Sequence, residues 1–182
     1  ITEGDWSSDV CSSDLPGVTV SGSRSDVIIQ STDLYPLILN AAGAAAPDHY
    51  VIDGVNILPA LRGEAFDRGP VFTFFPHSPG VPDWLPPAAA VHSGDWKLIR
   101  LFHQGENGAH DYLLYNLAED IGEKNNLATM HPERVCELDR LIEQHLTAAD
   151  AVVPLPNPGF DPEKYRPENI GVQTGGLKMA KP

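Results

Sequence analysis

Histidines are the residues of this sequence best suited to bind a metal ion or to move a proton near neutral pH. The seven are scattered along 182 residues, without an H-x-x-x-H pair and without a cysteine at the spacing of a zinc site. The sequence therefore does not predict a histidine metal site. They are His49, His77, His92, His103, His110, His131 and His145.

Other patterns typical of catalysis are also missing from the sequence. There is no G-x-S-x-G turn for a serine nucleophile and no glycine-rich loop for a phosphate. Glu119, Asp120 and Glu123 are close together in a turn, which we interpret as a solvated loop. Cys136 is expected to be a small, buried or boundary side chain on a helix. Residue types and spacing alone do not identify a catalytic centre.

A small antiparallel sheet is the element most clearly predicted. Residues 71–75, 88–92, 95–102 and 111–117 are short, strand-like runs, and apolar side chains alternate along DWKLIRLF. An Asn107–Gly108 pair between the last two runs is typical of a hairpin turn. We therefore expect about four strands in sequence order.

The last helix should begin near residue 132 and cover this sheet. Pro132 suits the first helical position, and apolar residues recur at helical spacing after it. A helix with such a stripe and a sheet with one apolar face can share a core. The stripe consists of Val135, Leu138, Leu141, Ile142 and Leu146.

An earlier helix is predicted from residue 31 or 32. Ser31 or Thr32 would cap it, with Asp33 in the first turn, and Gly43 would end it. A short helical turn ending at Arg62–Gly63 should follow. The apolar stripe of the earlier helix would comprise Leu34, Leu37, Ile38 and Ala41.

The first fifteen residues do not read as part of a fold. Residues 5–15, DWSSDVCSSDL, repeat Ser-Ser-Asp and have neither helical nor strand periodicity. Their codons can spell a DNA string that resembles a common sequencing adapter, so we interpret residues 1–15 as non-native. A natural Ser/Asp-rich linker is the alternative, and it alters no functional expectation.

Charge and hydropathy exclude some kinds of partner. The formal net charge is −13, and it is still −9 (12 basic against 21 acidic residues) without residues 1–15. An acidic surface argues against binding to nucleic acid. No apolar run approaches the roughly 20 residues of a membrane span, so none is expected.

Several segments, in this order and at these distances, resemble the C-terminal part of type I sulfatases of the alkaline phosphatase superfamily. The resemblance covers nearly all of residues 16–165. The segments are STDLYPLILNAAG, IDGVNILPALRGE, HSGDWKLI and LYNLAEDIGEKNNLA, with PGV at 16–18 and PNPGFDP at 156–162.

The resemblance implies a fold class and a division of the chain. It implies an α/β-family fragment: residues 16–67 would end the sulfatase α/β domain. Residues 68–150 would form an α+β subdomain, with the sheet of about four strands packed by the C-terminal helix. Residues 151–182 would be an extended tail.

The same resemblance implies the chemistry of the longer protein. Sulfatases hydrolyse sulfate esters with a formylglycine made in a C/S-x-P-x-R motif and with a divalent metal, usually calcium. That motif is absent here, and the metal ligands lie upstream in the family. No catalytic or metal-binding residue is therefore expected in this chain, which should bind no cofactor and be inactive alone. The implied partners are a sulfated small molecule or carbohydrate and the missing N-terminal catalytic domain. The resemblance also implies that the longer protein is periplasmic or secreted.

Two residues are candidates for contact with the substrate. Phe75-Pro76-His77 matches a place where many sulfatases carry Pro-His near the mouth of the active site. His77 could donate a hydrogen bond to a sulfate or sugar oxygen, or it could be a loop histidine bonded to backbone. Trp84, on the same loop, could form an apolar wall for a sugar or aryl group.

The segment 114–128, LYNLAEDIGEKNNLA, is expected to be structural. Glu123, Asn125 and Asn126 should bond backbone groups of the turn, and Leu127 should re-enter the core. Lys97, on the neighbouring strand, is expected to be solvated.

Two other functions remain open at the level of sequence. The longer protein could be a phosphomonoesterase or phosphodiesterase of the same superfamily. It could also be a sulfatase-like binding module that has lost its nucleophile. The residues encoded upstream of codon 16 discriminate among these, since C/S-x-P-x-R indicates a sulfatase.

Overall fold

The computed structural model describes residues 18, 19, 22, 24–77, 86–156, 158 and 159. The chain divides into two compact units, residues 1–68 and residues 69–182. Within the described ranges, no helix is long and apolar enough to cross a membrane.

The first unit contains a 3₁₀ turn η1 (Ser31–Asp33), which continues into helix α1 (Leu34–Ala41), and a short helix α2 (Leu58–Leu61). Gly43, with φ of +66°, lies just past α1 as predicted. Its N–H donates to Asn40 O, and the N–H of Ala44 donates to Leu39 O. This pair of hydrogen bonds is the glycine-based stop that satisfies the last carbonyls of a helix.

The predicted apolar stripe of α1 is wrong in part. Leu37 is buried and packs with Ile57 and Leu58, but Leu34 is 37% exposed and Ile38 is 63% exposed. Helix α1 has eight residues, and Leu37 is its one buried side chain within the described part of the chain.

A buried ion pair holds this unit together. The carboxylate of Asp33, which is fully buried, accepts hydrogen bonds from the N–H groups of Gln30 (2.7 Å) and Val55 (2.9 Å). Arg68 adds a bond from its guanidinium at 2.7 Å, with its side chain 8% exposed. Burial alone would raise the pKa of Asp33, but the bonds from Arg68 and from the backbone outweigh it and lower the pKa.

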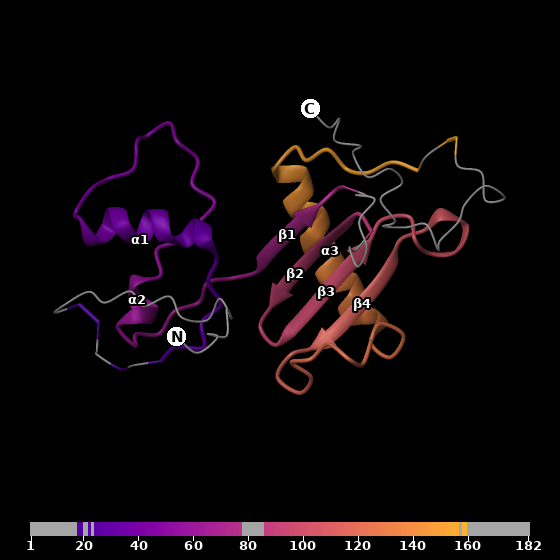
Figure 1. Cartoon of the computed structure of the whole chain (residues 1–182), viewed down its shortest axis with the longest axis horizontal. Helices are drawn as coiled ribbons and strands as arrows, with labels where there is room; N and C mark the ends of the chain where they lie inside the picture. Colours follow the sequence, from indigo (N-terminus) through magenta and orange to yellow (C-terminus); the bar gives the residue numbers. More distant parts are fainter. Residues whose placement is uncertain (1–17, 20–21, 23, 78–85, 157, 160–182) are drawn as a thin grey trace, which may run out of the picture. The chain divides into compact units, whose positions relative to one another are not determined.

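The second unit is a four-stranded antiparallel sheet covered on one face by a helix (Figure 1). Its strands are β1 (Val71–Phe75), β2 (Ala88–Ser93), β3 (Trp96–Leu101) and β4 (Asp111–Asn116), paired in that order. A 3₁₀ turn η2 (Glu106–Gly108) joins β3 to β4, and Asn107 and Gly108 both have positive φ there. Helix α3 (Pro132–Ala148) follows. The predicted fold class is confirmed.

The core of this unit lies between the sheet and α3. Leu138, Ile142 and Leu146 of α3 are buried, as their spacing predicts. They pack against side chains that alternate along the strands, so the predicted faces of residues 95–102 are also confirmed. The strand residues in this core are Ala89, Val91, Leu98, Phe102 and Leu114.

The segment after β4 closes the edge of the sheet. Asn126 accepts the N–H of Leu114 (2.9 Å) through Oδ1 and donates to Tyr112 O (3.1 Å) through Nδ2. The N–H of Leu127 donates to Leu114 O at 2.8 Å, and Leu127 packs on the core. The structural role predicted for Asn126 and Leu127 is confirmed.

Two details of this segment differ from the prediction. The carboxylate of Glu123 bonds the ammonium group of Lys97 at 2.6 Å instead of backbone groups, so Lys97 is paired and its side chain is 28% exposed. Asp120 is the residue that accepts backbone N–H groups, from Lys124 and Asn125, both at 2.8 Å. Asp120 stands at the start of the turn, where a short acceptor side chain reaches the following N–H groups.

Candidate functional site

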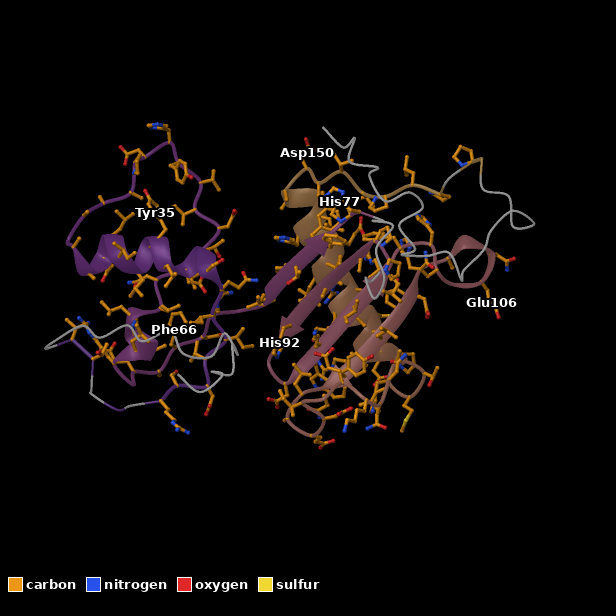
Figure 2. All side chains as sticks on the ribbon, in the orientation of Figure 1. Tyr35, Phe66, His77, His92, Glu106 and Asp150 are labelled. Carbon is orange, nitrogen blue, oxygen red and sulfur yellow. The ribbon has the colours of Figure 1, made fainter. Side chains whose placement is uncertain are left out.

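One end of the sheet carries three of the histidines. Phe75, Ala88, Leu101 and Asp111 are successive partners across the four strands at this end. His77 follows β1 by two residues, His103 follows β3 by two residues, and His110 directly precedes β4. We call this the histidine end of the sheet. Figure 2 shows His77 there and His92 at the other end, where His92 pairs with Val71.

His77 is the candidate for substrate contact that the structure describes. Its side chain is exposed, and its ring meets the ring of Phe75 edge-on with centroids 5.4 Å apart. Within the described part of the chain, no hydrogen bond from His77 to a backbone group is found. Trp84 lies outside the described residues. The substrate-binding roles of both residues stay predictions.

His103 and His110 form a pair at the β3–β4 turn. The backbone N–H of His103 donates to Nδ1 of His110 at 3.2 Å, and the two ring centroids are 4.9 Å apart. The His110 ring also meets Phe102 edge-on at 5.3 Å. Burial, and then the positive charges of Arg100 and His103, lower the pKa of His110, so this ring is neutral near pH 7.

A buried arginine supports this end of the sheet from the helix side. Arg100 on β3, with its side chain 4% exposed, bonds Asp139 Oδ1 at 2.6 Å and Glu143 Oε2 at 2.9 Å. It also donates to the backbone oxygen of Asp139 at 3.1 Å. Burial, and then the negative charge of Asp139, raise the pKa of Tyr112 to about 12. No local pattern in the sequence indicates this cluster, because Arg100 is 39 residues from Asp139 and 43 from Glu143.

Groups that could hold a metal are not assembled in the described residues. No set of three histidine, cysteine, aspartate or glutamate side chains converges in residues 24–77 or 86–156. Cys136 is an exposed free thiol on α3, which corrects the expectation of a buried or boundary position.

Known proteins with related sequences include two sulfatases. A sulfatase of Formosa agariphila is 32% identical over 125 residues, which is 65% of this chain and 22% of that protein. The uncharacterized sulfatase YdeN of Escherichia coli K12 is 25% identical over 154 residues, which is 68% of this chain and 26% of YdeN. The chain thus spans about a quarter of the length of these curated relatives. No family model matches the sequence.

Solved structures with a similar fold match about the same share of this chain. The crystal structure of Ps i-CgsB matches 71% of this chain and 27% of its own, with a TM-score of 0.57 and 23% identity. A second structure, a protein in complex with its substrate D-glucosamine-2-N,6-O-disulfate, matches 65% of this chain and 24% of its own, with a TM-score of 0.51 and 22% identity. At such identities the similarity supports the fold alone. Together with the sequence matches, it confirms that about two thirds of this chain resembles part of a sulfatase.

Proposed function

We propose that this chain is the C-terminal portion of a sulfatase that hydrolyses sulfate esters of a carbohydrate. The observation that carries the proposal is the 32% identity to the Formosa agariphila sulfatase over 125 residues. The glucosamine disulfate bound as substrate by a protein of the same fold supports a sulfated sugar as the substrate class.

In this proposal the reacting groups come from the preceding part of the longer protein. A formylglycine would supply the nucleophile, and a calcium ion would neutralise charge on the sulfuryl oxygens. The described residues include no cluster of three metal ligands. In this proposal the chain contributes a binding side chain at the edge of the site.

His77 is the side chain that we propose for this role. Its imidazole is exposed at the end of β1 and rests against the ring of Phe75, which limits its rotation. An imidazole can donate a hydrogen bond to a sulfate oxygen, and the bond is stronger if the ring is protonated. Trp84 would face the apolar side of the sugar ring, in line with the way aromatic rings bind ligands.

The test uses the protein encoded by the complete gene, with 4-nitrophenyl sulfate and glucosamine 6-O-sulfate as substrates. His77→Ala should lower kcat/KM more than tenfold without changing Tm. His92→Ala is the matched control, because His92 lies at the other end of the sheet, and it should leave kcat/KM unchanged. Equal rates for His77→Ala and the wild type would remove His77 from the site.

The sulfatase assignment itself has a separate test. The residues encoded upstream should contain C/S-x-P-x-R, and the complete protein should release sulfate from at least one of the two substrates. Release of phosphate from phosphate monoesters or diesters instead, without that motif, would identify a phosphoesterase. Absence of both activities and of the nucleophile would identify a binding module.

A further inference from the structure

Both ring nitrogens of His103 face backbone oxygens. Nδ1 lies 3.0 Å from Gly108 O in the turn between β3 and β4. Nε2 lies 3.0 Å from Pro154 O in the segment that follows α3. A carbonyl oxygen only accepts hydrogen bonds, so each nitrogen must carry a proton to bond its partner. A neutral imidazole carries one such proton, and only the imidazolium carries two.

We propose that His103 is a proton-dependent clasp that fixes residues 151–156 to the β3–β4 turn. Figure 1 shows this segment leaving the end of α3 and crossing toward the turn, and Figure 2 labels Asp150 and Glu106 at the two ends of that path. The protonated ring bridges the segment and the turn. Deprotonation removes one of the two bonds and frees one side of the bridge.

The backbone around His103 is arranged for this bridge. His103 has a φ of +57°, an uncommon conformation for a residue with a Cβ. Its N–H is bonded to Nδ1 of His110, so that nitrogen of His110 carries no proton. His110 therefore accepts from the backbone of His103, and both ring nitrogens of His103 are left to face the two carbonyl oxygens.

The other ionisable groups near His103 and His110 lie on the turn, on β3 and before residue 151. The turn contributes Glu106, which is exposed. β3 contributes Arg100, whose charge is matched by Asp139 and Glu143 of α3. Residues 151–156, AVVPLP, contribute no ionisable side chain, and Asp150 precedes them. Loss of one ring proton from His103 should therefore open the clasp.

The experiment follows the ring and the segment together by NMR in the 182-residue chain. At pH 5.5, long-range ¹H–¹⁵N spectra should show protons on both nitrogens of His103. At this pH, the ¹³C relaxation of Val153 and Leu155 should correspond to a small amplitude of motion. At pH 8 the ring should carry one proton, and the amplitude of motion at Val153 and Leu155 should rise about twofold or more.

Three variants decide which group is responsible. His103→Gln should show the larger motion at both pH values, because an amide cannot donate in two opposite directions. His92→Gln should behave as the wild type, because His92 lies at the other end of the sheet. His110→Gln should also behave as the wild type, because its side-chain oxygen can still accept the His103 N–H. Equal motion at both pH values in the wild type would overturn the proposal, as would a pH response that survives in His103→Gln or disappears in His110→Gln.

Discussion

Arg100 on β3 bonds Asp139 on α3 through two separate groups, the carboxylate at 2.6 Å and the backbone oxygen at 3.1 Å. The arginine side chain is 4% exposed, whereas the side chain of its second partner, Glu143, is 65% exposed. The bond to Asp139 therefore lies in a region of much weaker solvent screening than the bond to Glu143.

Removing Asp139 should destabilise the second unit much more than removing Glu143. Asp139→Ala leaves a buried guanidinium without its main partner, and we expect the free energy of unfolding to fall by about 3 kcal/mol. Glu143→Ala removes an exposed partner and should cost less than about 1 kcal/mol. Urea denaturation followed by circular dichroism measures both values. Equal losses would show that burial does not determine the strength of these bonds.

Replacing the two adjacent asparagines after β4 should also cost different amounts of stability, because Asn126 bonds the N–H of a buried residue. Asn126→Ala leaves the N–H of Leu114, a fully buried residue, without its side-chain acceptor. We expect a loss of about 2 kcal/mol and faster hydrogen exchange at that N–H. Within the described residues, the side chain of Asn125 makes one 3.3 Å bond, to the exposed Asp120, so Asn125→Ala should cost less than about 0.5 kcal/mol. A larger effect of Asn125→Ala would contradict the assignment of Asn126 as the residue that closes the sheet edge.

Asp33 should make the first unit sensitive to acid. Its pKa is lowered in the folded state, so the charged carboxylate stabilises the fold above the unfolded-state pKa of about 3.9. This contribution is lost as the pH falls through the folded-state pKa. Asp33→Asn should therefore have a lower Tm than the wild type at pH 7, and the difference should shrink toward pH 2.

The control for this prediction is Asp53→Asn, because Asp53 is exposed in the turn that precedes Val55. Its Tm should follow that of the wild type at every pH. A difference between Asp33→Asn and the wild type that stays constant from pH 7 to pH 2 would mean that the charge of Asp33 does not contribute.

Local patterns in the sequence predicted the second unit well. Alternation along residues 95–102 and helical spacing from Val135 to Leu146 each report which face of an element meets the core. Such patterns depend on neighbours within one turn or one strand, so they can be read without knowing the rest of the fold.

Contacts between distant residues could not be read in this way. Asp33 and Arg68 are separated by 35 residues, and Arg100 and Asp139 by 39. Each of these side chains is an ordinary charged residue in its own neighbourhood, and only the fold gives it a partner. The same reason explains why the prediction for Glu123 is wrong, since its partner Lys97 lies on β3, outside the turn. The roles of His77 and Trp84 depend on a substrate and stay predictions.

The strands of the second unit are neighbours in space in the same order as in the sequence. Each pairing thus joins strands that follow one another in the sequence, and α3, which packs on them, comes after β4. Proteins dominated by such local pairings have low contact order and fold quickly for their size. We therefore expect refolding of this unit from denaturant to be rapid and to follow a single exponential.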